Sequence, residues 1–134
     1  KRARTTFKLL FENDKYVIGL AFPQTGRQHQ IRAHAAVHGY PLIGDKLYNG
    51  DAFVFSRFKN NESTPEDFKL MQLPRHALHA IALKLPYPNP KEDSLFRGSV
   101  PPEFLEWIRE KIPEYQTQYL EDDIIPVLKG YFYD

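Results

Sequence analysis

A chain of 134 residues, 42% of them hydrophobic, is long enough to bury a core but leaves little for a second one, so we expect one domain or part of one. Its 18 basic and 17 acidic residues nearly cancel, which excludes a general electrostatic attraction to nucleic acid or to an anionic membrane and leaves only local basic patches. The absence of cysteine excludes disulfides and thiolate metal sites, and no apolar run approaches the roughly 20 residues that span a bilayer, so we expect a cytoplasmic protein.

Two segments near the start of the chain predict an antiparallel hairpin. Residues 5–11 carry an apolar side chain at every second position, and residues 15–22 are rich in apolar and β-branched side chains. The sequence Glu-Asn-Asp at 12–14 favours a turn between them, and Pro23 is expected to end the second strand because proline cannot donate to a strand ladder. The chain starts with Lys1 instead of Met and enters this pattern almost at once, as expected of a piece of a longer protein.

A helix and a glycine-containing loop are predicted next. Residues 28–38 suit a helix, with Gly39 as the residue that ends it. The apolar residues are spread around the helix axis, which is typical of a short helix inside a domain. Arg32 on such a helix would be a buried charge, and a buried charge has to be paired or hydrogen-bonded. Residues 42–50 then form a loop built on Gly-Asp and Asn-Gly turns.

The rest of the chain contains one predicted strand and one well-marked helix. Residues 51–73 mix aromatic and charged side chains and are interpreted as an insertion, with a helical turn near 65–70. The largely apolar stretch at 76–85 predicts a central strand that is covered on both faces. Two prolines open the helix predicted at 103–111, and the aromatic and acidic residues 114–134 are interpreted as an appendage.

Two histidines on the predicted helix raise the question of a metal site. His34 and His38 lie four residues apart, a spacing that lets two imidazoles bind one ion, and Asp45 follows along the chain. No third ligand has a recognisable spacing and the HExxH motif is absent, so no metal is predicted and a metal-dependent enzyme is a distant alternative. The serines and glycines match neither a nucleophile elbow nor a phosphate-binding loop.

Basic residues recur along the chain. Taken alone, Lys1, Arg2 and Arg4 are more simply interpreted as a solvated end of the chain, and Lys46 as an ordinary surface lysine. Together with Tyr48 and the histidines, they favour a local surface for a nucleic-acid backbone. These residues are Lys1, Arg2, Arg4, Arg27, Arg32, Lys46 and Arg75.

Three motifs occur in order within residues 22–88. Residues 25–34 read Thr-Gly-Arg-Gln-His-Gln-Ile-Arg-Ala-His. Residues 39–45 read Gly-Tyr-Pro-Leu-Ile-Gly-Asp and are followed by Tyr48 and Gly50, and Arg75 is followed by Leu-His-Ala at 78–80. In this order and spacing they resemble the second half of the RluA/RluD-type RNA pseudouridine synthases. The resemblance implies an α+β fold with a mixed, mostly antiparallel sheet flanked by helices. It also implies that residues 1–113 are the C-terminal part of the catalytic domain.

The activity implied by the resemblance is the isomerisation of uridine to pseudouridine in structured RNA. The implied partner is ribosomal or transfer RNA, and the reaction needs no cofactor and no membrane. Members of the family use an aspartate in a His-Arg-Leu-Asp stretch that lies upstream of these motifs, and this sequence contains no such stretch. The chain alone is therefore expected to be inactive. The alternative interpretation is a non-catalytic RNA-binding or protein-interaction module that retains the synthase scaffold.

The resemblance also implies roles for individual residues. Arg32, the final arginine of the first motif, is implied to pair with the catalytic aspartate of the intact enzyme, and Asp45 is not assigned as the nucleophile because it belongs to the Gly-Asp turn. Leu78, or less readily Ile43, is implied to pack against the flipped uracil. The other candidates, for holding phosphates or the framework of the site, are Arg27, His29, Lys46 and His79.

Overall fold

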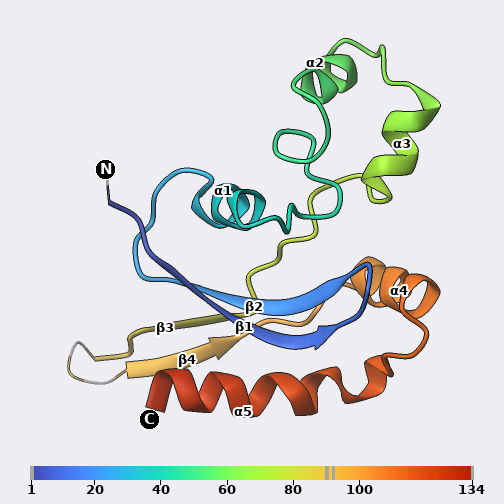
Figure 1. Ribbon diagram of the computed structural model, residues 1–134. Helices are drawn as coiled ribbons and strands as arrows, with labels where there is room; N and C mark the ends of the chain where they lie inside the picture. Colours follow the sequence, from blue (N-terminus) through green and yellow to red (C-terminus); the bar gives the residue numbers. More distant parts are fainter. Residues whose placement is uncertain (1, 90, 92, 134) are drawn as a thin grey trace. The chain divides into compact units, whose positions relative to one another are not determined.

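The computed structural model describes residues 2–89, 91 and 93–133, which form four strands and several helices (Figure 1). The strands are β1 (Thr5–Glu12), β2 (Val17–Pro23), β3 (Ala82–Pro86) and β4 (Asp93–Arg97). The helices are α1 (Gln30–Val37), α2 (Val54–Lys59), α3 (Pro65–Met71), α4 (Pro102–Lys111), the 3-10 helix η1 (Thr117–Tyr119) and α5 (Leu120–Tyr133). Lys1 of the basic N-terminal segment and Asp134 of the expected appendage lie outside the described residues.

The chain divides into two compact units that share the first hairpin. The first unit takes in the chain up to Phe7 and Ala21–Leu78, and the second takes in Lys8–Leu20 and the chain from His79 onward. Helices together with antiparallel strands confirm the α+β class. The expectation of one mixed sheet is wrong for the described residues, because β1 pairs with β2 and β3 pairs with β4 in two separate sheets. Each pair forms between strands that are neighbours along the chain.

The β1–β2 hairpin has the predicted position and turn. Asn13 closes the turn, because its Oδ1 accepts hydrogen bonds from the backbone N–H groups of Lys15 at 2.9 Å and Tyr16 at 2.7 Å. The Asn13 N–H donates in turn to the Tyr16 carbonyl at 3.0 Å. Asparagine favours such turns because its short side chain reaches the backbone that follows it. Pro23 is the last residue of β2, as predicted.

α1 confirms the predicted helix over a shorter range. It ends where predicted, since Gly39 has a φ of +87° and donates its N–H to the Ala36 carbonyl at 3.0 Å. The expectation that this helix lies inside the domain is wrong. Within α1 only Gln30 and Ala35 are buried, and Val37 is 82% exposed, because so short a helix packs through its inner face alone.

α2 and α3 are a pair of short helices joined by an ion pair. α3 confirms the helical turn predicted near 65–70, whereas α2 has no counterpart among the predicted elements. Thr64 and Asp67 form a capping box at the start of α3: Thr64 Oγ1 accepts from the Asp67 N–H at 3.1 Å, and Asp67 Oδ2 accepts from the Thr64 N–H at 3.0 Å. Arg57 of α2 donates to the same carboxylate from Nε at 2.7 Å and from Nη2 at 2.6 Å. This bidentate contact fixes α2 to α3.

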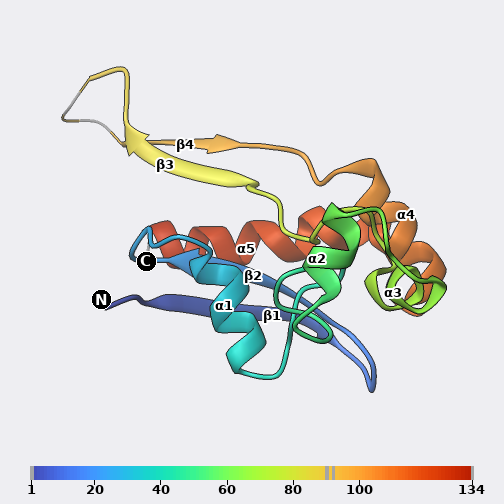
Figure 2. The same ribbon diagram turned by 90° about the horizontal axis from the view of Figure 1, so that it is seen from above.

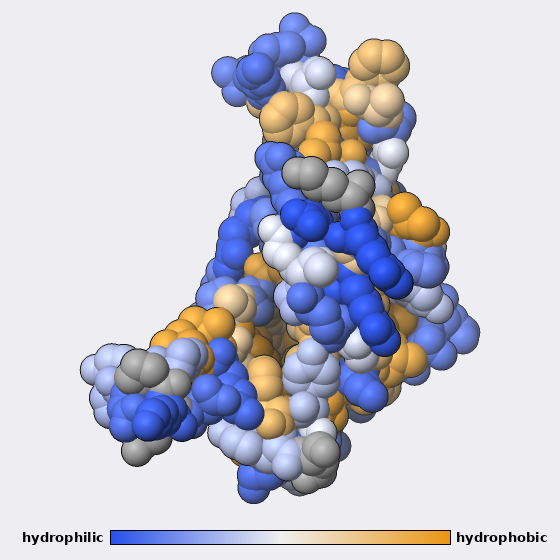
Figure 3. Space-filling view, turned by 90° about the vertical axis from the view of Figure 1, so that its left-hand side faces the viewer, coloured by the Kyte–Doolittle hydropathy of each residue, from blue (hydrophilic) through white to orange (hydrophobic). Residues whose placement is uncertain are grey.

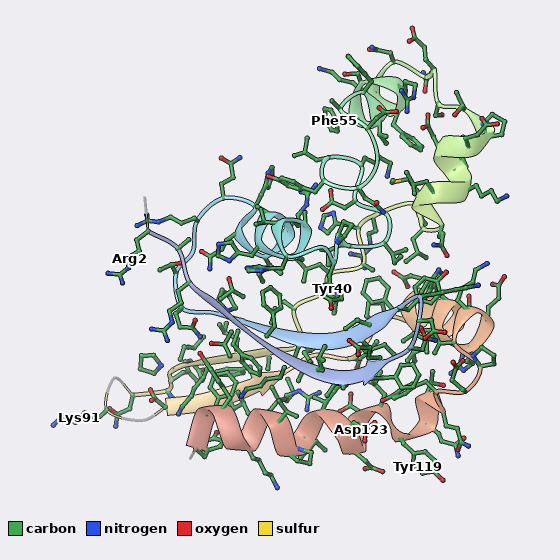
Figure 4. All side chains as sticks on the ribbon, in the orientation of Figure 1. Arg2, Tyr40, Phe55, Lys91, Tyr119 and Asp123 are labelled. Atoms are coloured by element: carbon green, nitrogen blue, oxygen red, sulfur yellow. The ribbon has the colours of Figure 1, made fainter. Side chains whose placement is uncertain are left out.

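Phenylalanines cover much of the outer surface of the α2–α3 pair. Phe53, Phe55 and Phe68 are all exposed, and Figure 4 shows Phe55 on α2. Figure 3 shows hydrophobic patches among hydrophilic ones at the top of the view, where this pair lies. Val54 of α2 and Met71 of α3 are buried. The aromatic residues of this segment are therefore largely surface residues.

β3 and β4 form the second hairpin, in which Leu83 lies opposite Phe96 (Figure 2). The prediction of a central, doubly covered strand at 76–85 is wrong in its start and in its surroundings. β3 begins only at Ala82, it pairs with one strand, and Leu83 is 59% exposed. An apolar run by itself does not distinguish a covered strand from an apolar connection. β4 has no counterpart among the predicted elements.

Helices α4 and α5 supply the core of the second unit. α4 confirms the predicted helix and has Pro102 in its first turn, where the missing N–H of proline costs no helical hydrogen bond. α5 has no counterpart among the predicted elements, because Pro126 lies in its interior and proline usually ends a helix. Among the described residues, no helix has the length and hydrophobicity needed to cross a bilayer. The buried apolar residues here are Ile108, Ile112, Tyr115, Leu120, Ile124 and Leu128.

Candidate functional site

A shallow cleft of about 260 Å³ lies in the first unit at the start of α1. The loop between β2 and α1 and the first turn of that helix form its wall, together with Leu78. Most of its polar groups come from the motif at 25–34, so one short stretch of sequence supplies nearly the whole lining. The lining residues are Pro23, Thr25, Gly26, Arg27, His29, Gln30, Ile31, Arg32 and Leu78.

Gln30 holds the wall of this cleft to the first strand. Its Oε1 accepts hydrogen bonds from the Thr25 hydroxyl at 2.5 Å and from the Arg27 backbone N–H at 3.1 Å. Its Nε2 donates to the Arg4 carbonyl at 2.7 Å and to Thr5 Oγ1 at 2.8 Å. The amide is buried, and both its donors and both its acceptor positions are used. The loop before α1 is therefore held in one conformation.

The rim of the cleft carries two exposed side chains that can bind an anion. Arg27 is exposed, and its Nε donates to the Arg2 carbonyl at 3.2 Å. His29 is exposed as well, has a left-handed φ of 55°, and lies with its ring 6.1 Å from the Tyr48 ring in an edge-to-face arrangement. Hydrophilic side chains gather at mid-height of the face seen in Figure 3. A charged backbone such as that of RNA is the kind of ligand that such a rim suits.

Arg32 and Asp45 form a bidentate ion pair. Arg32 Nε lies 2.9 Å from Asp45 Oδ2, and Arg32 Nη2 lies 2.8 Å from Asp45 Oδ1. Asp45 is fully buried, and its Oδ1 also accepts hydrogen bonds from the backbone N–H groups of Leu47 at 3.0 Å and Tyr48 at 3.1 Å. The requirement that the charge of Arg32 be paired is thus met by Asp45. Its pairing with a catalytic aspartate stays a prediction.

Burial and hydrogen bonding act in opposite directions on Asp45. Burial alone raises the pKa of its carboxyl, but the hydrogen bonds from Arg32 and from the amides of Leu47 and Tyr48 outweigh it, and the net pKa lies below the ordinary value. The hydrogen bond to Asp45 in turn raises the pKa of Arg32. Both groups are therefore charged at neutral pH.

The Gly-Asp turn brings Asp45 to this position. Gly44 has a φ of +78°, and a Cβ on it would lie 2.8 Å from the Arg75 carbonyl carbon and closer still to the carbonyl oxygen. The Ala77 N–H donates to the Ile43 carbonyl at 2.7 Å, so the turn lies against the segment that leads to Leu78. Glycine is required at position 44 because any other residue would separate these two pieces of backbone.

Tyr48 and His76 complete the surroundings of Arg32. The guanidinium carbon of Arg32 lies 5.5 Å from the centroid of the Tyr48 ring, a cation–π distance. The pKa of His76 is lowered, first by burial and then by the positive charges of Arg32, Arg75 and Lys46, against an opposing effect of Asp45. Burial and these positive charges therefore favour the neutral form of the His76 imidazole.

The cleft brings together four of the seven candidate residues, namely Arg27, His29, Arg32 and Leu78. Lys46 lines a second depression of about 420 Å³ instead, where its Nζ lies 5.0 Å from the centroid of the Phe58 ring and donates to the Pro74 carbonyl.

The two remaining candidates have other surroundings. Ile43 lines neither the cleft nor the depression beside Lys46, and its carbonyl accepts a hydrogen bond from the Ala77 N–H. His79 belongs to the second unit, where its ring lies 6.3 Å from the Phe104 ring.

Other residues enter the site although no role was assigned to them from sequence. Gln30 and Asp45 stand inside the motifs, and the one available signal was that a buried arginine needs an acidic partner. No feature of the sequence indicated a role for His76. His34, considered above as a metal ligand, has its Nδ1 2.8 Å from Thr5 Oγ1. In the part of the chain that the structure describes, no three His, Asp or Glu side chains are grouped as metal ligands.

Comparison with known proteins finds no family model and no solved structure that matches. It does find curated relatives named ribosomal large subunit pseudouridine synthase D. The relative from Pasteurella multocida is 36% identical over 101 residues, which is 75% of this chain and 29% of the relative. The relative from Haemophilus ducreyi is 38% identical over 101 residues, 74% of this chain and 29% of the relative. The relative from Buchnera aphidicola subsp. Baizongia pistaciae is 35% identical over 108 residues, 81% of this chain and 33% of the relative. The chain thus spans a third or less of the length of these relatives.

Proposed function

The chain belongs to the RluA/RluD-type family of RNA pseudouridine synthases, and we propose that, as part of an intact enzyme, it isomerises uridine to pseudouridine in ribosomal RNA. Ribosomal RNA is chosen over transfer RNA because the relatives are named for the large ribosomal subunit. In this proposal residues 1–113 are the C-terminal part of the catalytic domain. Residues 51–73 are an insertion in it, and residues 114–134 are an appendage.

One observation carries the proposal: the cleft beside α1 joins cations, an imidazole and an apolar side chain. Arg27, His29 and Arg32 lie with Leu78 around a volume of about 260 Å³. A base inside structured RNA has to leave its stack before its glycosidic bond can be attacked. Leu78 offers the flipped uracil an apolar surface, and Arg27 and His29 at the rim offer contacts to the phosphates on either side of it.

The reaction rearranges one nucleotide and needs no further reactant. The C1'–N1 bond breaks, the uracil rotates, and a C1'–C5 bond forms. The proton on C5 is lost and N1 takes up a proton, so atoms and charge balance without a cofactor. The residues of this chain would bind the RNA, hold the flipped base and orient the catalytic carboxylate.

That carboxylate is proposed to come from a part of the intact enzyme outside these 134 residues, since the sequence contains no His-Arg-Leu-Asp stretch. Arg32 is proposed to pair with it. An arginine within hydrogen-bond reach keeps a partly buried carboxylate ionised and fixes its direction. Lysine is a point charge without the planar fork, so it is a poor substitute at such a position.

The test is to measure tritium release from ribosomal RNA that contains [5-³H]uridine, because forming the C1'–C5 bond expels the hydrogen on C5. We expect release by the intact enzyme and none by the 134-residue chain alone. In the intact enzyme Arg32→Lys should lower kcat by at least about 100-fold. Arg57→Lys is the matched control, since Arg57 also forms a bidentate ion pair but lies on α2 outside the cleft lining.

The outcomes distinguish the proposal from its alternative. An intact enzyme that binds ribosomal RNA but releases no tritium would favour a non-catalytic RNA-binding or interaction module with the same scaffold. Release from transfer RNA instead of ribosomal RNA would leave the chemistry standing and change the substrate. Release by the 134-residue chain alone would show that its own residues suffice, against the assignment of the carboxylate to another part of the enzyme.

A further inference from the structure

Arg32 is held by two residues, through a carboxylate and through an aromatic ring. In its plane, Nε and Nη2 are bound by Asp45 at 2.9 and 2.8 Å. The guanidinium carbon of Arg32 also lies over the Tyr48 ring, 5.5 Å from the centroid of that ring. We call these two residues, Asp45 and Tyr48, the Arg32 clamp. A guanidinium has one edge formed by Nε and Nη2 and another formed by Nη1 and Nη2. Asp45 occupies the first edge, and Nη1 makes no hydrogen bond to any residue that the structure describes.

The Asp45 carboxylate is fully hydrogen-bonded and is not accessible to a substrate. Its carboxylate receives four hydrogen bonds, two from Arg32 and one each from the N–H groups of Leu47 and Tyr48. It is fully buried, so neither oxygen is open to a substrate atom. Asp45 can therefore affect the reaction only through Arg32, the residue whose side chain it binds. The same carboxylate also fixes the backbone at Tyr48, so one residue sets both parts of the clamp.

We propose that Asp45 and Tyr48 are positioning residues, which fix the Arg32 guanidinium so that its Nη1–Nη2 edge is the one presented to the catalytic carboxylate. This inference rests on the proposed function. It explains why the acidic partner of Arg32 within the chain is not the catalytic group: that partner binds the Nε–Nη2 edge of the guanidinium and leaves Nη1 for a second carboxylate. A free arginine side chain would sample many orientations, whereas the clamped one loses little freedom when the second carboxylate binds.

Two variants of the intact enzyme test the clamp. Asp45→Asn keeps the shape but removes the charge, and we expect kcat to fall by about 100-fold with KM for RNA nearly unchanged. Tyr48→Leu removes the ring but keeps the backbone N–H that binds Asp45, and we expect a fall of about tenfold. Asp67→Asn is the matched control, because Asp67 is also buried and bound by an arginine through two hydrogen bonds. It should lower the melting temperature and leave kcat unchanged.

A double variant separates positioning from a general structural role. If Asp45 acts through Arg32, then adding Asp45→Asn to Arg32→Lys should lower kcat far less than it does in the wild-type enzyme. Equal, additive losses would contradict the proposal. Unchanged kcat in a folded Asp45→Asn or Tyr48→Leu enzyme would also overturn it, and Tyr48→Leu decides the matter if Asp45→Asn does not fold.

The geometry of the clamp can be read on the 134-residue chain without activity. The NMR signal of the Arg32 Nε–H should be protected from exchange with water, and Asp45→Asn should abolish this protection. A signal that exchanges as fast as those of exposed arginines would contradict the clamp. If the intact wild-type enzyme makes no pseudouridine while the Nε–H is protected, the proposed function fails and the clamp stands as a structural feature without a catalytic role.

Discussion

Gly44 and Arg75 approach each other more closely than any side chain at position 44 would allow. A Cβ on Gly44 would lie 2.8 Å from the carbonyl carbon of Arg75 and 3.2 Å from the Leu73 carbonyl oxygen. This contact joins the turn that carries Asp45 to the segment that leads to Leu78. The Arg32 partner and the apolar wall of the cleft therefore depend on one glycine.

Gly44→Ala should destabilise the chain by about 2 kcal/mol or more, because it adds a steric clash to the cost of a left-handed φ. Gly39→Ala is the control, since Gly39 has a similar φ of +87° but no atom within 4 Å of its Cβ position. It should cost only about 1 kcal/mol. Urea unfolding of both variants measures the difference, and equal costs would argue against the close approach at Gly44.

Gln30→Glu should destabilise the loop before α1. The substitution replaces the Nε2 donor by a second carboxylate oxygen, which would face the Arg4 carbonyl oxygen without a hydrogen to share and could no longer donate to Thr5 Oγ1. We expect a loss of about 2 kcal/mol. Gln28→Glu makes the same chemical change at an exposed neighbour and should cost almost nothing. A Gln30→Glu chain as stable as the Gln28→Glu chain would show that the network around Gln30 is dispensable.

Acid should weaken the α2–α3 pair. The hydrogen bonds from Arg57 hold the pKa of Asp67 well below its ordinary range, and the Thr64 N–H adds to this effect. An unfolded Asp67 has the ordinary pKa of about 3.9, so the unfolded chain binds this proton first. The stabilisation is complete above that value and is lost as the pH falls through the lower pKa of the folded state. Asp67→Asn and Arg57→Gln should each flatten the decline in unfolding free energy below about pH 4, and an unchanged slope would contradict the assignment.

His76 should titrate below its ordinary pKa. After burial, the largest cause is the positive charge of Arg32, with smaller effects from Arg75 and Lys46. Arg32→Gln should therefore raise the pKa of His76 more than Lys46→Gln does, and NMR titration of the imidazole protons measures both. If Lys46→Gln has the larger effect, His76 lies closer to the second depression than to the ion pair.

The elements that sequence predicted well are those with local signals. The β1–β2 hairpin has period-two strands and the Asn13 turn, α1 has Gly39 at its end, and α4 has proline at its start. The failures have non-local causes. α2 is six residues long with no capping side chain, and α5 contains Pro126, so tertiary packing decides both. β3 starts later than the sequence predicts because residues 77–81, apolar except for His79, extend the apolar run without belonging to the strand.

The candidate site likewise has residues that the sequence predicted and residues whose roles depend on non-local contacts. Sequence indicated that the charge of Arg32 needs a partner, and the motifs supplied Arg27, His29 and Leu78, which line the cleft. It did not indicate that Asp45 is that partner, because the contact spans thirteen positions and depends on how the Gly-Asp turn lies against residues 73–77. Lys46 could not be placed from sequence either, since its contact with the Phe58 ring requires α2, which has no local signal.

The two units are interleaved along the chain, and this has a thermodynamic consequence. Lys8–Leu20 belongs to the second unit but is flanked on both sides by the first, where the Gln24 N–H donates to the Arg4 carbonyl at 2.9 Å. If the second unit unfolds while the first stays folded, Lys8–Leu20 is a flexible loop whose two ends are held together by the first unit. Closing such a loop costs conformational entropy. When the second unit is folded, that loop is already ordered. Each unit thus lowers the entropic cost of folding the other through the covalent chain alone, and a cut after Leu78 would leave residues of the second unit in both fragments.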